Sequence, residues 1–350
     1  MLKFGNTYLN FGGTYLTNWT AFEPLNPLGL PPYTIRLKYD VGVTPSFSKG
    51  TATQVSQSPN IWDLTYNNKN WESLLNNHTN LLEVIGANSK EVTGLRLTFY
   101  NCTSLTSLNL FDTNKVTDMR STFASCKTLP TIPLYDTSNV TSMTSTFMWC
   151  NSLTSVPLLD THKVTNMSQM FHSCSSFLEC VPNFDTSNVT SMVSMFQHCH
   201  RLTAVPLFDT SNVTDTNGMF MSCSSLLYSP NFDTNKVTNM SKMYKDCYSL
   251  KEMPSLDTSN VTNAQEMYAR DAAITSTIPL YNTTKMTNMN QMFYGCTRVA
   301  GGSLALYEQA NAQGNVTGHN GTFHRCGVLS QTGSAELAQI PSDWTAFKYN

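Results

Sequence analysis

"FDTSNVTSMVSMFQHCHRLTAVPLFDTSNVT", residues 184–214, ends by repeating its own beginning, because the seven residues from Phe184 recur from Phe208. Aligned on the aspartate, the repeat has a period of 24 residues, with one extra residue near Cys180. Roughly ten such units follow one another, so a repeat array accounts better for the 350-residue chain than two unrelated domains. The aligned aspartates are Asp112, Asp136, Asp160, Asp185, Asp209, Asp233 and Asp257.

Each unit combines two kinds of local pattern. Val140, Met143, Phe147 and Cys150 are spaced three, four and three residues apart, which predicts one face of a short helix. The "DTSN" before it supplies residue types that cap helix starts, and "SLTSVPL" after it predicts a short strand that ends at proline. A helix and a short parallel strand in every unit predict an α/β repeat, wound as a right-handed solenoid.

These units resemble the BspA-like leucine-rich repeats of bacterial surface proteins. The resemblance covers residues 80–326 and rests on units such as "FDTSNVTSMVSMFQHCHRLTAVPL". The chain departs from the family by a shorter segment between strand and aspartate, where proline stands. The resemblance implies a leucine-rich-repeat solenoid used for adhesion or recognition, and it implies neither catalysis nor a cofactor.

The repeat weakens toward both ends of the chain. Trp71, Leu75 and His78 take the places of Met, Phe and Cys, as expected of a degenerate capping unit. We therefore expect three regions: a β-containing N-terminal attachment region at 1–60, the solenoid with its capping units at 61–330, and a C-terminal cap at 331–350.

Local patterns predict further elements outside the repeats. The alternation in "YTIRLKYDVGV" predicts a strand, and "NNKNWESLL" and "SLALYEQANAQ" predict helices. The stretch between the first two of these, residues 44–60, is expected to be a loop. In order, the ranges are Tyr33–Val43, Asn67–Leu75 and Ser303–Gln313, and we expect Glu336–Ile340 and Trp344 to close the solenoid.

Nine of the ten cysteines share one position of the repeat, and Cys180 is the exception. Zinc sites and disulfide frameworks need paired spacings such as Cys-x2-Cys, which are absent. A ladder of small buried thiols is the favoured interpretation. The nine residues are Cys102, Cys126, Cys150, Cys174, Cys199, Cys223, Cys247, Cys296 and Cys326.

Three other features, two of them repeated, invite functional interpretations that we weigh against structural ones. The aspartates are expected to cap helices rather than bind calcium, because "DTSNVT" lacks the glycines of calcium-binding solenoids. The Asn-x-Thr triplets follow from the repeat and are not expected to carry glycans. The scattered histidines, of which His198 and His200 are the close pair, form no catalytic motif, so we expect no enzyme activity, metal or cofactor.

A hydrophobic residue precedes each aspartate, and an exposed aromatic row there would suit sugar rings. The row never turns polar, which favours burial in the core. The binding surface is then expected at polar strand positions, namely Ser107, Thr131, Ser155, Ala204 and Glu252.

Charge and hydropathy exclude some classes of partner. The formal net charge is -2 and 13% of residues are charged, so no basic surface for nucleic acid is expected. No apolar run reaches the length of a membrane span, and the first residues lack a signal-peptide core.

The N-terminal residues "FGNTYLN" and "FGGTYLT" form a small repeat of their own. Aromatic residues around Gly turns predict a hairpin or an extended arm that attaches to another virion or surface protein. The residues expected to attach are Phe4, Tyr8, Phe11, Tyr15 and Trp19.

The two ends of the chain resemble virion proteins of phages that infect gut Bacteroidales. This second resemblance rests on residues 1–60 and on "ELAQIPSDW". We therefore expect a non-enzymatic recognition protein on a virion surface, as a fibre or decoration protein that binds a host-surface protein or glycan. A bacterial cell-surface adhesin is the alternative. A homo-oligomer is compatible with either setting.

Overall fold

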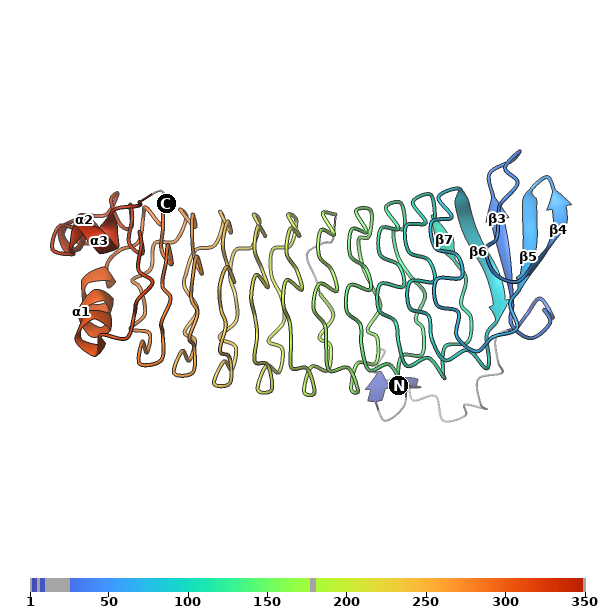
Figure 1. The fold of residues 1–350 in the computed structure, drawn as a ribbon, viewed down its shortest axis with the longest axis horizontal. Helices are drawn as coiled ribbons and strands as arrows, with labels where there is room; N and C mark the ends of the chain where they lie inside the picture. The colour runs from blue at the N-terminus through green and yellow to red at the C-terminus, as the bar shows by residue number, and fades with distance from the viewer. Residues whose placement is uncertain (1, 5–6, 10–25, 177–180, 349–350) are drawn as a thin grey trace.

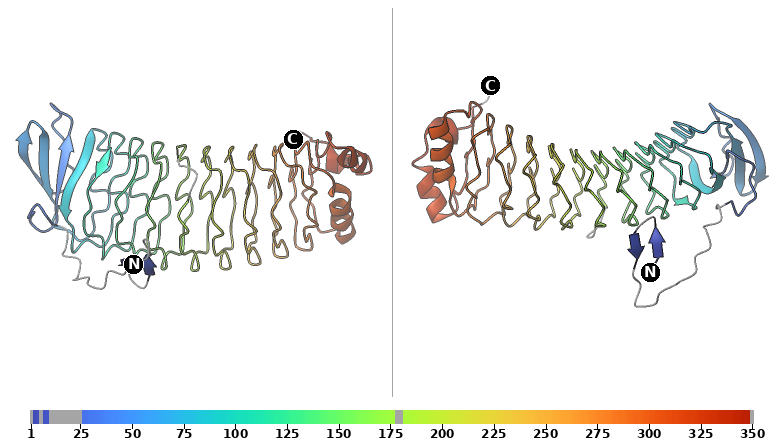
Figure 2. Two further views of the ribbon diagram at one scale, coloured as in Figure 1. Left: turned by 180° about the vertical axis from the view of Figure 1, so that it is seen from behind. Right: turned by 90° about the horizontal axis from the view of Figure 1, so that it is seen from below.

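The structure is a computed structural model that describes residues 2–4, 7–9, 26–176 and 181–348. It is a long stack of similar coils, with a β-sheet at one end and three helices at the other (Figure 1). Seen from below, the stack is gently curved (Figure 2). Because each coil lies on the next, residues one repeat apart in sequence become neighbours in space.

Successive coils are joined by a ladder of backbone hydrogen bonds. One residue in each coil forms a parallel bridge to the next, in an unbroken series from Asn70 to Gly318. In the residues that follow the bridge, the backbone amides donate alternately to the next coil and to their own coil. Ser145 N donates to Ser168 O in the next coil at 2.9 Å, whereas Thr146 N donates to Met143 O in its own coil at 3.2 Å. Both sets of backbone groups are thereby satisfied.

The helix predicted within each unit is wrong. Residues 143–150 form consecutive turns, and the backbone takes positive φ at Ser145 (56°) and Trp149 (61°). Equivalent residues in the other coils do the same. A right-handed helix cannot pass through two left-handed residues four apart, although the i to i-3 turns still direct Met143, Phe147 and Cys150 inward.

The predicted strand is also shorter than expected. β7 (Ser107–Leu108) pairs with β6, and the later coils that the structure describes have no named strand at this place. A single backbone bond remains there, such as the 2.9 Å bond from Thr154 N to Pro130 O. Proline at the strand position has no N–H to donate, so the ladder does not extend.

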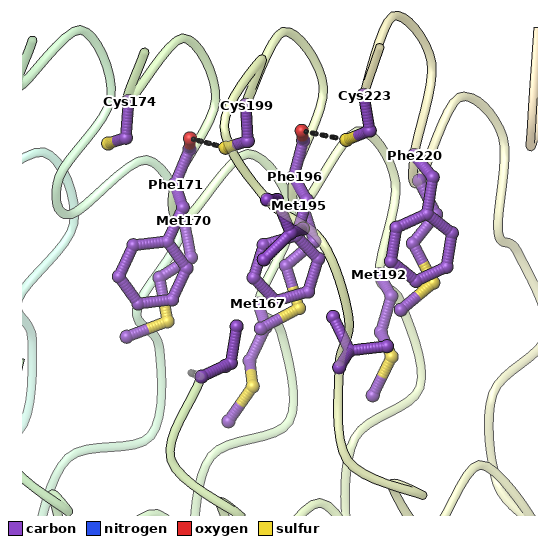
Figure 3. Packing of buried hydrophobic residues seen from close by; sticks show 14 of the residues in the cluster. Met167, Met170, Phe171, Cys174, Met192, Met195, Phe196, Cys199, Phe220 and Cys223 are labelled. Carbon is purple, nitrogen blue, oxygen red and sulfur yellow. Dashed lines mark hydrogen bonds between the residues drawn. The ribbon is translucent and has the colours of Figure 1, made fainter. Parts of the chain in front are cut away.

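The core consists of rows of identical side chains that run along the stack. Figure 3 shows Met170, Phe171 and Cys174 repeated one coil later as Met195, Phe196 and Cys199. The rings of Phe171 and Phe196 are stacked with their centroids 5.7 Å apart. These residues are fully buried, which confirms the interior positions expected from the repeat.

The N-terminal end of the stack is covered by a five-stranded sheet in the order β4-β5-β3-β6-β7. Its strands β3 to β6 are antiparallel, and Ile35 and Leu37 of β3 are buried against the first coils. The bounds are β3 (Thr34–Tyr39), β4 (Thr51–Gln57), β5 (Asn60–Thr65) and β6 (Leu81–Asn88).

This sheet corrects three expectations. The strand predicted at Tyr33–Val43 is confirmed but ends at Tyr39, and the expected loop at 44–60 contains β4. The expected helix at Asn67–Leu75 is instead the turn segment of the first coil, where Trp71 and Leu75 are buried. The expected boundary at residue 60 would divide β4 from its hairpin partner β5, whereas the sheet continues past that residue.

The chain ends carry the remaining elements. β1 (Leu2–Phe4) and β2 (Thr7–Leu9) pair antiparallel, as the predicted hairpin requires. α1 (Ser303–Gln313) matches its prediction, and α2 (Gln331–Leu337) and α3 (Ser342–Thr345) follow it. Trp344 is buried and stacks on Phe323 with ring centroids 6.2 Å apart, so it closes the last coil as expected.

Candidate recognition surfaces

The repeated polar residues "DTSN" hold turns and coils together. Asp136 Oδ1 accepts a 3.0 Å hydrogen bond from Ser138 N, and Thr137 Oγ1 donates a 2.7 Å bond to Asp160 O in the next coil. The aspartate therefore caps a turn instead of a helix. Thr137 is 1% exposed, so its hydroxyl is a buried link between coils.

The asparagines of the Asn-x-Thr triplets have structural partners. Asn139 Nδ2 donates to Asn114 O at 2.7 Å, and Asn188 Nδ2 donates to His162 O at 2.7 Å. Equivalent bonds to the preceding coil are made by Asn212, Asn260 and Asn315. Each side-chain amide is thus engaged in joining coils, which accounts for its repetition.

The cysteine ladder is buried as expected. Nine cysteines are free and buried, and Cys180 lies outside the described residues. Cys150 Sγ donates to Phe123 O in the preceding coil at 3.0 Å. Burial raises the pKa of the Cys150 and Cys199 thiols to about 12, so they carry no thiolate at neutral pH.

The hydrophobic row before the aspartates is also buried. Its described members are between 1% and 7% exposed, which rules out this row as a sugar-stacking surface in the folded chain. The residues are Phe111, Tyr135, Leu159, Phe184, Phe208, Phe232, Leu256 and Tyr281.

Asp271 replaces cysteine in one coil and is fully buried. Its Oδ1 accepts a 2.8 Å hydrogen bond from Cys247 N, and its Oδ2 has no hydrogen-bond partner. Burial raises the pKa of this carboxyl well above its usual range. The group lies in the core and does not line a surface.

The five residues predicted to bind a ligand occupy one position, five residues after each cysteine, and we call this row the strand row. Thr131, Ser155, Ala204 and Glu252 are exposed, and Ser107 is half-buried. Tyr228 occupies the same position and is 57% exposed, and it was not among the residues predicted to bind. The strand row is a surface row, and binding by it stays a prediction.

A second group of unrepeated side chains lies around the left-handed turn next to the cysteine ladder. We call it the ring edge, and its members are Trp149, His172, His198, His200, Asp246, Tyr248 and Arg270. Four of them are exposed, His172 and His198 are half-buried, and Asp246 is buried at 8% exposure. The ring centroids of Trp149 and His172 are 6.4 Å apart, those of His172 and His198 are 5.6 Å apart, and those of His198 and His200 are 5.8 Å apart.

The ring edge continues across the following coils through polar contacts. His200 Nδ1 lies 3.0 Å from Ser222 O. Tyr248 donates its hydroxyl hydrogen to Asp246 Oδ1 at 3.0 Å, and Arg270 Nη1 lies 3.4 Å from the same oxygen. Aromatic rings, hydrogen-bonding groups and one ion pair are thus arranged in a strip along the stack, as two contacting groups on either side of the coil that contains Ser222.

Electrostatics keep this strip close to neutral. Burial lowers the pKa of His172 and His198, and the neighbouring histidine lowers each further. The charges of Asp246 and Arg270 offset each other. Sequence reasoning noted the pair His198 and His200 but missed the strip, since nothing in the sequence shows which residues take positive φ.

The other predicted site residues lie at the N-terminus. Phe4 is in β1 and Tyr8 is in β2, whereas Phe11, Tyr15 and Trp19 lie outside the described residues. Among the residues that the structure describes, no group of three or more His, Cys, Asp or Glu side chains can hold a metal ion. None of the described helices has the length and hydropathy to cross a membrane.

Comparisons with known proteins give one family match and one structural match. A family model described as "Mycoplasma protein of unknown function, DUF285" matches residues 93–158, 148–230 and 227–333. The crystal structure of a leucine rich cell surface protein from Faecalibacterium prausnitzii A2-165 is 20% identical with a TM-score of 0.35, covering 68% of this chain and 78% of that chain. No curated protein matches the sequence.

Proposed function

Since the chain belongs to the family described as Mycoplasma protein of unknown function, DUF285, we propose that it is a non-enzymatic recognition protein displayed at a surface. The observation that carries this proposal is the division between two kinds of position. Repeated residues such as Thr137 and Cys150 are buried and join coils, whereas exposed positions such as Trp149 and Glu252 change from coil to coil. A fixed scaffold with a variable surface suits binding.

We also propose that the fold is a right-handed leucine-rich-repeat solenoid with units of 24 residues. Side-chain bonds between residues 24 apart, such as the 2.6 Å bond from Lys163 Nζ to Asn139 Oδ1, support that unit length. The absence of catalysis is likewise proposed. The carboxyl with the strongly raised pKa, Asp271, is sealed in the core and does not reach a substrate.

A bacterial cell surface is the setting that we favour, because the repeats resemble BspA-like repeats of bacterial surface proteins. The virion setting rested on the chain ends and stays a prediction, as does attachment through the N-terminal region of residues 1–60. Mass spectrometry of purified phage particles and of envelope fractions from the same culture tests the setting. Detection in the envelope alone supports the cell surface, and detection in particles alone overturns it.

Binding is tested with fluorescently labelled chain on intact epithelial cells and on immobilised mucin. Saturable binding that unlabelled chain displaces supports recognition. A chain unfolded in urea and returned to buffer without refolding is the control for nonspecific adhesion. Equal retention of the folded and unfolded chains would overturn the proposal.

A further inference from the structure

The ring edge places large side chains where the backbone disfavours them. Trp149, His198 and Arg270 have φ values of 61°, 61° and 71°, in the left-handed region that glycine and asparagine tolerate best. The repeat supplies its own comparison, because other coils have Asn101, Ser125, Ser173, Ser222 and Gly295 at this position. The fold therefore does not require a large side chain there.

Two of these side chains are also largely outside the core. Trp149 is 42% exposed, and the side chain of Arg270 is 56% exposed. A strained position that holds an exposed Trp or Arg is better explained by contact with another molecule than by folding.

The backbone of the ring edge is already engaged. Trp149 N donates to His172 O at 2.8 Å, His198 N to Met221 O at 2.8 Å, and Arg270 N to Tyr294 O at 2.6 Å. These bonds join neighbouring coils, so the amides are not free to pair with an added peptide strand. Recognition at the ring edge must use side chains.

We propose that the ring edge binds an uncharged oligosaccharide chain lying along the stack, an inference that rests on the proposed function. Aromatic faces such as Trp149 pack against the C–H faces of sugar rings, and the imidazoles and Arg270 exchange hydrogen bonds with hydroxyl groups. Asp246 is buried and positions Arg270. The near-neutral charge of the strip gives no attraction for an acidic chain. From Trp149 to Arg270 the strip crosses five coil steps, about 24 Å at strand spacing, which favours an extended ligand.

Affinity gel electrophoresis of the whole chain tests this inference. Native gels contain mannan, xylan or β-1,3-glucan as neutral polysaccharides, or hyaluronan as an acidic one. We expect at least one neutral polysaccharide to retard the wild-type chain and hyaluronan to leave it unretarded. Retardation by hyaluronan alone, or by none of the four, would overturn the inference.

Two variants locate the site. Trp149→Ser and His198→Ser introduce the residue that neighbouring coils already have, so folding is retained and is checked by circular dichroism. Each is expected to weaken retardation at least tenfold. Leu207→Ser, which changes a 62% exposed leucine elsewhere on the coil, is the matched control and should bind as wild type.

Different results would contradict the ring-edge inference and the proposed recognition function. If the ring-edge variants bind polysaccharide as tightly as wild type, the ring edge is not the site. If the ring-edge variants also keep full binding to epithelial cells, recognition stands and its surface lies elsewhere. If the wild-type chain does not bind cells at all, the proposed function is contradicted instead.

Discussion

The hydroxyl of Thr137, a residue that is 1% exposed, donates a 2.7 Å hydrogen bond to the main-chain oxygen of Asp160 in the next coil. The same link recurs from Thr113 to Asp136 and from Thr161 to Asp185, and further along the stack. Interaction between neighbouring coils is the main source of stability in repeat proteins, so this bond is a structural element of the whole molecule.

Replacing Thr137 by valine keeps the shape of the side chain and leaves Asp160 O without this donor. We expect the free energy of unfolding to fall by about 1 to 3 kcal/mol, because a partly buried carbonyl loses its donor from a buried threonine. Thr141→Val is the matched control, since Thr141 Oγ1 makes the same type of bond to Thr117 O at an exposed position. At that exposed position, water can donate to Thr117 O in place of the lost hydroxyl. Urea unfolding measures both, and equal effects would contradict the account.

Replacing Asp271 by cysteine restores the repeat and removes a buried carboxyl. Because the pKa of Asp271 is raised in the folded chain, folding favours its protonated form. Its contribution is least unfavourable below the unfolded pKa of about 4, and stability falls by up to about 1.4 kcal/mol per pH unit above it, until the folded pKa is reached.

We therefore expect Asp271→Cys to be more stable than the wild type, with a larger difference at pH 8 than at pH 5. Asp271→Asn serves as the control because it cannot titrate over this range. Chemical unfolding at the two pH values measures the difference. A difference that shrinks as pH rises would show that the carboxyl is not held protonated.

The cysteine ladder makes a prediction about reactivity. The nine described thiols are buried and their pKa values are raised, so a thiol reagent at pH 8 should not modify them in the native chain. After unfolding in guanidinium, all ten cysteines of the sequence should titrate. A much lower count after unfolding would reveal disulfides.

The N-terminal sheet determines how many N-terminal residues can be deleted without loss of stability. Deleting residues 1–60 removes β3 with its buried Ile35 and Leu37, and loss of such side chains costs roughly 2 to 5 kcal/mol each. Deleting residues 1–25 leaves the five-stranded sheet complete. Thermal unfolding should show a markedly lower midpoint for the longer deletion, and similar midpoints for both would contradict the role of β3 as a cover.

Sequence reasoning predicted the interior better than the backbone. The period and spacing placed Phe147 and Cys150 correctly inside, because burial follows the recurrence of apolar residues whatever the local conformation. The same spacing suggested a helix, and it failed because Ser145 and Trp149 have positive φ, for which serine and tryptophan give no signal. β4 was missed because its residues Thr51–Gln57 are polar and largely exposed, which resembles a loop.

The surfaces were predicted only in part. The strand row was found because its position follows from the repeat register. The ring edge depends on residues from several coils that meet around a turn, so its neighbours become visible only when the coils are stacked.

The central claim is that repeated residues build the scaffold and exposed, unrepeated residues carry recognition. The most direct test is the binding of labelled chain to intact epithelial cells, compared between the wild type and a variant that combines Trp149→Ser, His198→Ser, Tyr228→Ser and Glu252→Ala. The account predicts that cell binding is lost while the thermal midpoint stays within about 4 °C of wild type, since exposed substitutions change stability little. Undiminished cell binding by the folded variant would contradict it.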